Sequence, residues 1–152
     1  MQARIESPAQ TVPGAMAALQ RLGRAVHETG VPETTLKLVE LRASQINGCA
    51  VCVDMHAREL RNLGESDARI FTVAAWREAP YFTDAERAAL ALTDAAFQPN
   101  PRGDERISDE LFAQAAKHYD DKALSTLMVV IASAGFWMNV AILLKPPVAQ
   151  NA

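Results

Sequence analysis

Three residues whose side chains could do redox chemistry lie within one short stretch, QINGCAVCVDMH, residues 45–56. Cys49 and Cys52 are the two cysteines of the chain, and His56 follows four residues after the second. On a helix, residues three, four and seven apart share one face, so these side chains would form one stripe. A thiol pair beside an imidazole could react with a peroxide or a disulfide, or could hold a metal ion.

The residues in front of the pair favour redox chemistry. Asn47-Gly48 is a turn signal, so we expect a helix that begins at or near Cys49. Free backbone N–H groups and the dipole at a helix start stabilise a thiolate relative to a thiol. A thiolate attacks a peroxide oxygen or a disulfide sulfur, and a neighbouring cysteine can then close a disulfide. His56 could accept the proton or, when protonated, supply a positive charge.

Other interpretations of the cysteines compete with this one. Free cysteines are often buried as small apolar residues without a chemical role. A structural zinc site would need a fourth ligand, and the other histidines, His27 and His118, lie far away in the sequence. A catalytic metal with three protein ligands could use the same residues, but it would leave the helix-start position unexplained. Thioredoxin-like proteins also carry CxxC, but no βαβ pattern surrounds this motif.

The elements that must position these residues are predicted to be helices. Apolar residues recur at helical spacing, and no alternating run bounded by turns predicts a strand. The pattern predicts an all-α fold of about six to seven helices in a single domain, residues 1–152. The expected helices cover about residues 12–30, 32–47, 49–64, 66–77, 83–97, 108–119 and 127–144.

Helix ends and buried faces can be assigned within this pattern. Gly30 is a C-terminal cap signal, and Thr83 to Glu86, TDAE, is a capping-box pattern. We expect the ends of the chain, residues 1–10 and 148–152, to be loosely held. The residues predicted to face the core around the motif are Leu36, Val39, Ala43, Ile46, Leu60 and Leu63.

Composition and charge exclude some classes of function. The chain has 152 residues, 49% of them hydrophobic and 22% charged, which is typical of a soluble globular protein. A net charge of −3 provides no basic patch for nucleic acid. The first residues, MQARIESPAQTVPG, lack a signal-peptide pattern, so we expect a cytoplasmic protein. Because the cytosol keeps thiols reduced, a permanent structural disulfide is a poor explanation for the cysteines.

One apolar stretch approaches the length of a membrane span, LMVVIASAGFWMNVAILL, from Leu127 to Leu144. Ser133, Gly135 and Asn139 interrupt it, and no basic flank precedes it. We therefore interpret it as a buried core helix or a subunit-interface helix, without a membrane partner. Apolar surface of this extent usually marks an interface, so we expect a homo-oligomer.

The motif resembles that of a known family. LRASQINGCAVCVDMHARELRNLGES is similar to the core motif of the AhpD-like alkylhydroperoxidases, within the carboxymuconolactone decarboxylase superfamily. ARIFTVAAWREAPYFTDAERAALALTDA and IASAGFWMNVA resemble the next segment and the last helix of that family, so the likeness covers nearly the whole chain. The resemblance implies an AhpD-like helical fold, with its core motif at about residues 36–97, and assembly as a homotrimer or homohexamer.

The resemblance also implies a function. It implies a thiol-dependent hydroperoxide reductase that needs no metal or organic cofactor, with a dithiol or lipoyl-type reductant as its electron donor. Cys52 would attack the hydroperoxide, Cys49 would be its resolving partner, and His56 would be the relay base. The alternative is a non-catalytic redox sensor or helical binding protein of the same superfamily.

Two positions depart from the family's relay. The family has a histidine just before the second cysteine, where this chain has Val51, and a glutamate twelve residues before the first, where it has Lys37. Glu40 lies one turn after Lys37, on a polar stripe that runs toward the Asn-Gly break. We predict that Glu40 lies near His56 and partly replaces the relay glutamate; a solvated face is the competing interpretation. Because Val51 cannot transfer a proton, we expect weaker peroxidase activity than in members with the full relay.

Overall fold

Helices make up every regular element in the part of the chain that the computed structural model describes, residues 3–26, 29–98 and 106–148. The predicted all-α class is therefore confirmed. The structure has one helix more than expected, because the short α1 forms near the start. The elements are α1 (Pro8–Thr11), α2 (Pro13–Ala25), α3 (Glu33–Asn47), α4 (Ala50–Asn62), α5 (Asp67–Thr72), the 3₁₀ turn η1 (Val73–Ala75), α6 (Asp84–Phe97), α7 (Asp109–Ala115) and α8 (Asp121–Leu144).

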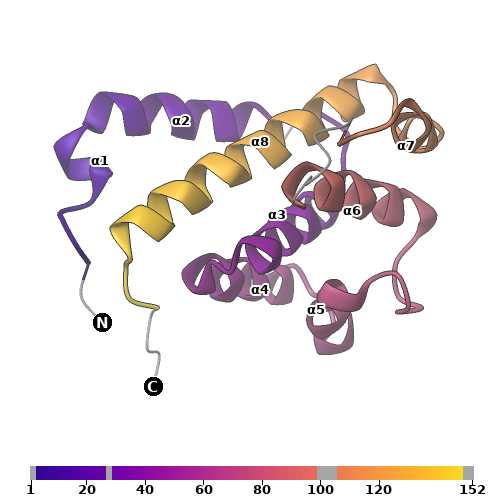
Figure 1. The fold of residues 1–152 in the computed structure, drawn as a ribbon, viewed down its shortest axis with the longest axis horizontal. Coiled ribbons are helices and arrows are strands. Elements are labelled where there is room, and N and C mark those ends of the chain that lie inside the picture. Colours follow the sequence, from indigo (N-terminus) through magenta and orange to yellow (C-terminus); the bar gives the residue numbers. More distant parts are fainter. Residues whose placement is uncertain (1–2, 27–28, 99–105, 149–152) are drawn as a thin grey trace.

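Helix α3 lies at the centre of the arrangement and packs against α4, α6 and α8. Helix α8 crosses the molecule diagonally, α2 lies beyond it at the edge, and α5 and α7 lie at the end far from the chain termini (Figure 1). The short loop between α3 and α4 makes these two helices neighbours. The segment that carries the cysteines is thus held between α3 and α8.

The central position of α3 explains its composition. Leu36 and Val39 enter a core cluster with α6, α7 and α8, whereas Leu38 and Leu41 enter a second cluster with α4, α5 and α6. Ala43 enters a third cluster around the cysteines. The prediction that Leu36, Val39 and Ala43 are buried is confirmed, but α3 is buried on two faces, so its apolar residues do not form a single stripe.

Several helix ends differ from the predicted ones. Helix α2 ends at Ala25, because Val26 turns into the core and Thr29 Oγ1 donates a hydrogen bond to its carbonyl oxygen. The helices expected to reach residues 77 and 119 end at Thr72 and Ala115 and continue as tighter turns. Leu63 was expected to face the core but is 40% exposed, just beyond the end of α4. The sequence predicted that this helix would continue to Gly30. Residues 27 and 28 of that predicted stretch fall outside the described residues.

The capping predictions agree better with the structure. Thr83 and Glu86 form the expected capping box at the start of α6, with each side chain bonded to the other's backbone N–H.

Arg4 is bonded through its backbone N–H to the carbonyl oxygen of Leu144, so the expectation of a loosely held first segment was wrong in part.

By length and composition alone, helix α8 is long and apolar enough to cross a membrane, a property that the core helix of a soluble protein can share. Only 22% of an 18-residue apolar stretch of this helix is buried. One face of α8 supplies Leu124, Leu127 and Val130 to the core, while Met128 and Leu143 are 52% and 70% exposed. One face of α8 is therefore a core face, and the alternative of a subunit-interface helix stays a prediction for the other face.

Candidate redox site

A glycine with a left-handed backbone ends α3 and starts the site. Gly48 has φ 66° and caps α3, while the backbone N–H of Cys49 donates to the carbonyl oxygen of Ser44. A residue with a side chain is disfavoured at this φ, so the glycine sets the sharp change of direction. Cys49 is then the N-cap residue of α4, and Cys52 is the third residue of that helix. The predicted start of this helix is confirmed.

Cys49 and Cys52 form a disulfide in this structure, with 5.3 Å between their Cα atoms. The two residues are 4% and 5% exposed and pack against Ala43 of α3 and against Ala134 and Met138 of α8. The bond joins two residues of the first turn of α4, where backbone N–H groups have no partner within the helix. On reduction, a thiolate at this position would be stabilised by those groups.

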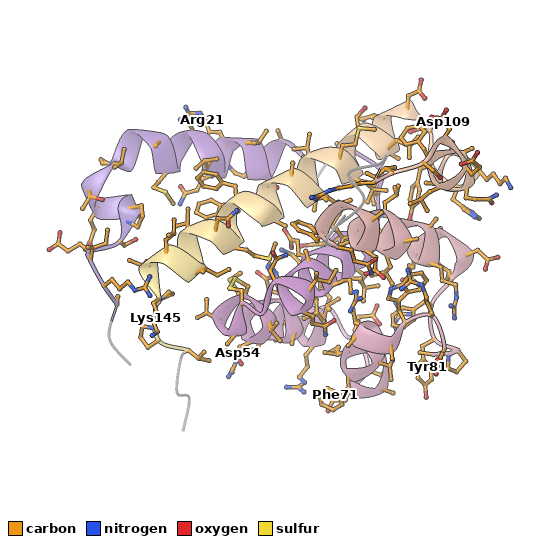
Figure 2. All side chains as sticks on the ribbon, in the orientation of Figure 1. Arg21, Asp54, Phe71, Tyr81, Asp109 and Lys145 are labelled. Carbon is orange, nitrogen blue, oxygen red and sulfur yellow. A yellow bond between two sulfur atoms is a disulfide. The ribbon has the colours of Figure 1, made fainter. Side chains whose placement is uncertain are left out.

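Solvent approaches the pair from the Cys49 side. A cavity of about 140 Å³ is lined by Gly48, Cys49 and Val51 from the start of α4 and by Ala141 and Lys145 from the end of α8. Lys145 and Asp54 of α4 lie on the same side of the molecule (Figure 2). Of the two cysteines, Cys49 is the one that lines this cavity.

His56 lies one turn after Cys52 and is held by two carboxylates. Its Nδ1 lies 2.9 Å from Glu59 Oε2 on the same helix and 3.4 Å from Glu40 Oε2 on α3. Lys37 Nζ lies 2.9 Å from Glu40 Oε2 and 3.1 Å from Glu59 Oε2. The structure thus brings Glu40 to His56, as expected from the polar stripe, and joins α3 to α4 through four charged or ionisable groups.

The charge states within this network follow from its geometry. Burial disfavours the ionised form of Glu59, but hydrogen bonds from His56 and Lys37 outweigh it and lower the pKa of Glu59. Burial likewise opposes protonation of Lys37, yet Glu40 and Glu59 together raise its pKa. At neutral pH the network therefore holds an ammonium and an ionised Glu59. Because an ionised carboxylate only accepts hydrogen bonds, Nδ1 of His56 donates and Nε2 remains available for proton exchange.

Glu59 was not identified from the sequence. The signal that could have found it is the spacing His-x-x-Glu, which places the carboxylate one turn beyond the imidazole on the same face. Lys37 was recognised as a departure from the family relay on the same polar stripe as Glu40. Its pairing with Glu59 depends on how α3 crosses α4, which local spacing does not encode.

The same cluster has the composition of a metal site. Ligand atoms of Glu40, His56 and Glu59 all lie within 4.8 Å of one another. Lys37 Nζ, however, lies within about 3 Å of both carboxylates, where its ammonium supplies the balancing positive charge. A divalent ion would have to displace Lys37, and the cysteines are bonded to each other in a separate cluster. The residues present fit a proton relay better than a metal site.

A buried carboxylate fixes α3 behind the site. Asp94 of α6 is 1% exposed and accepts hydrogen bonds from Arg42 Nε at 2.5 Å, from Trp76 Nε1 at 3.2 Å and from Arg77. Burial opposes ionisation of Asp94, but Arg42 and Arg77 lower its pKa overall. This network ties α3 to α6 and to the two residues that follow η1, so it holds the helix that carries Lys37 and Glu40.

Comparison with known proteins places this geometry in a family. The model of the carboxymuconolactone decarboxylase family matches residues 13–95, which is more than half of the chain and includes the cysteine pair and its relay residues. The chain belongs to the carboxymuconolactone decarboxylase family. The uncharacterized protein YdfG of Bacillus subtilis (strain 168) is 31% identical over 134 residues, 88% of each chain. The uncharacterized protein YnjA of Escherichia coli (strain K12) is 35% identical over 94 residues, 62% of this chain and 50% of YnjA.

Solved structures identify the fold of this family member. A protein of unknown function from Agrobacterium tumefaciens, suggested to be the antioxidant defence protein AhpD, is 34% identical and superposes with a TM-score of 0.86 over 97% of this chain and all of its own. The debrominase Bmp8 superposes with a TM-score of 0.81 over 93% of this chain and 74% of its own. Its identity is 18%, so that likeness concerns the fold alone. The predicted AhpD-like membership and fold are confirmed.

Proposed function

We propose that this protein is a thiol-dependent hydroperoxide reductase. The observation that carries the proposal is the Cys49–Cys52 disulfide at the first turn of α4, with His56 one turn further along the same helix. A pair that closes within one helical turn can cycle between dithiol and disulfide without unfolding the helix. Membership of the AhpD-like group supports the same chemistry.

The proposed cycle has two half-reactions. The Cys52 thiolate attacks the terminal oxygen of the hydroperoxide ROOH, which breaks the O–O bond, releases ROH and leaves a sulfenic acid on Cys52. The Cys49 thiol then displaces water and closes the disulfide. A dithiol donor, of the lipoyl type in our proposal, attacks Cys49 through the 140 Å³ cavity and finally leaves as a cyclic disulfide. Two thiols and ROOH thus yield a disulfide, ROH and water, and the donor restores both thiols.

His56 moves the protons in this proposal. It takes the proton of the Cys52 thiol and returns one to the alkoxide that leaves. Glu59 holds Nδ1, Lys37 of α3 holds Glu59, and Glu40 in turn pairs with Lys37. Val51 supplies no proton at the position where the full relay has a histidine, so turnover should be slower than in members that have it.

The direct test is turnover of the purified protein. With a dihydrolipoyl or other dithiol donor, it should consume an organic hydroperoxide over many cycles. Mass spectrometry should show a Cys49–Cys52 disulfide that forms quickly on addition of peroxide. Replacing the attacking thiol, Cys52→Ser, should abolish consumption, and unchanged turnover in that variant would refute the proposal.

A second candidate is a redox sensor whose cysteines respond to oxidants without turnover. The burial of both cysteines, at 4% and 5% exposed, favours it, because sensing needs only one slow oxidation. Multiple turnovers per subunit would exclude the sensor. If each subunit is oxidised once and no dithiol reduces it again, the sensor would replace the peroxidase as the proposed function. In either role we expect a cytoplasmic protein, because both the peroxidase and the sensor start from reduced thiols, which the cytosol maintains.

A further inference from the structure

A hollow lined by apolar residues lies between α6, α7 and α8. Its volume is about 310 Å³, and every residue that lines it is apolar. Leu92, Leu124 and Ile131 form its floor and belong to the main core cluster. Phe112 and Met128, which are 36% and 52% exposed, form its rim. Helix α8 starts beside α7 and passes over α6 at this place (Figure 1).

One residue of this cavity also packs against the cluster that holds the cysteine pair. Phe97, the last residue of α6, lines the cavity and also packs against the cluster of Cys49, Cys52 and Met138. Gly135 of α8 lets the ring lie this close, because a Cβ there would lie 3.2 Å from Phe97 Cε1. The ring of Phe97 is thus a wall shared by the cavity and the disulfide cluster.

The lining selects the kind of molecule that can enter. Water finds no hydrogen-bond partner among apolar side chains, so such a cavity is filled favourably by hydrocarbon. The cavity is separate from the one that opens at Cys49 and Lys145, which leaves that route to the thiol donor. The two openings lie along different parts of α8, the apolar one at residues 124–135 and the other at residues 141–145.

We propose that the cavity between α6, α7 and α8 binds the hydrocarbon body of the hydroperoxide, with the peroxide group directed past Phe97 to the cysteine pair. This assignment rests on the proposed function for the peroxide end, whereas binding of a hydrocarbon can be measured without it. It gives the protein a preference for alkyl hydroperoxides over hydrogen peroxide, which has no apolar body to bury.

The assignment can be tested by filling the cavity with a larger side chain at its exposed rim. Ala132 lines the cavity and is exposed, so Ala132→Phe should fold while it occupies the space. The ratio of kcat/KM for an alkyl hydroperoxide to that for hydrogen peroxide should fall about tenfold, corresponding to lost burial of about two methylene groups. Met128→Glu, which places a charge at the rim, should lower the ratio as well. Ser125→Phe, at an exposed position of α8 that does not line the cavity, should leave it unchanged.

Binding is measured separately with decanol, by displacement of anilinonaphthalene sulfonate from the Cys52→Ser protein. Decanol should bind this protein, and Ala132→Phe should weaken binding while Ser125→Phe should not. If no peroxide is consumed but decanol binds in this pattern, the proposed function fails and the cavity assignment stands as a hydrocarbon site. If decanol does not bind, for example because a second copy covers the cavity, or if the ratio is the same in all variants, the assignment is overturned.

Discussion

At the scale of single residues, His56 is the group on which proton movement depends, and two carboxylates compete for its Nδ1. Glu59 Oε2 is the nearer, at 2.9 Å against 3.4 Å for Glu40 Oε2. A carboxylate bonded to Nδ1 fixes the tautomer and leaves Nε2 for exchange. Because a hydrogen bond weakens steeply with length, Glu59 should orient the ring and Glu40 should mainly hold Lys37 in place.

Replacing Glu59 should therefore slow the reaction with peroxide. In Glu59→Gln the amide can donate to Nδ1, which permits the wrong tautomer, and we expect disulfide formation to slow by about tenfold or more. Stopped-flow fluorescence with mass spectrometry would measure the rate. Asp54→Asn is the matched control, since it removes a carboxylate of the same helix that pairs with Arg58. Equal rates in the two variants would show that Glu59 does not position His56.

Glu40→Gln should have a smaller effect than Glu59→Gln. Lys37 would lose one partner but keep Glu59 at 3.1 Å, so the imidazole would stay oriented. We expect a fewfold loss of rate and an altered pH dependence, since one negative charge near His56 disappears. If both the rate and its pH dependence match the parent protein, Glu40 has no relay role and the polar stripe is only structural.

At the scale of elements, the buried Asp94 decides how firmly α3 is held. Removing one member of a buried ion pair leaves its partner without compensation, which costs about 3–5 kcal/mol. Asp94→Asn should lower the free energy of unfolding in urea by about this amount at neutral pH. Asp67→Asn, which breaks an exposed pair with Arg61, should cost less than about 1 kcal/mol. Similar losses in both variants would contradict the role given to Asp94.

The effect of Asp94 should also depend on pH. Its pKa is lower in the folded protein than in the unfolded chain, where an aspartate has a pKa of about 3.9. Ionised Asp94 therefore stabilises the fold fully above that pH, and its contribution is lost as the pH falls through the lower, folded value. The stability difference between the parent and Asp94→Asn should shrink in acid, and urea titrations at several pH values would show this. A difference that stays constant into acid would rule out the ionised carboxylate as its source.

The turn between α3 and α4 can be tested with a glycine pair. No atom lies within 4 Å of a Cβ built on Gly48 or on Gly14, so neither substitution meets a steric clash. Gly48 has φ 66°, and Gly48→Ala should cost about 1–2 kcal/mol of stability through backbone strain. Gly14→Ala, within α2, should be neutral or stabilising. Thermal unfolding would separate the two, and equal effects would argue against a strained turn ahead of Cys49.

Local signals predicted the elements better than their ends. The capping box at Thr83 and the helix start at Cys49 are determined by neighbouring residues, so the sequence predicted both. The end of α2 depends on Val26 entering the core, and the exposure of Leu63 depends on what lies beyond α4; both are tertiary effects. The site divides in the same way. The cysteines and His56 share one helix, whereas the pairing of Lys37 with Glu59 arises from the packing of α3 on α4.

At the scale of the whole molecule, two helices carry apolar surface that one chain does not cover. None of the residues of α2 is buried, although Met16, Leu19 and Leu22 recur at helical spacing. The outer face of α8 exposes Phe136, Ile142 and Leu143 at 43%, 47% and 70%. Patches of this kind usually mark interfaces between proteins. They support assembly into a homo-oligomer, which we propose is a homotrimer or homohexamer with α2 and α8 in contact with neighbouring copies.

Sedimentation velocity can test this assembly. The protein should sediment as a trimer or hexamer at micromolar concentration, and Leu22→Glu should shift it toward smaller species, because a carboxylate cannot be buried without a partner. Leu22 is 43% exposed, so the substitution should leave the fold of the single chain intact, as circular dichroism would confirm. Arg21→Glu is the control on the same helix, since Arg21 points away from the rest of the molecule (Figure 2). A stable monomer in the parent protein would refute the assembly. Equal dissociation in both variants would show that charge, and not the apolar face of α2, controls it.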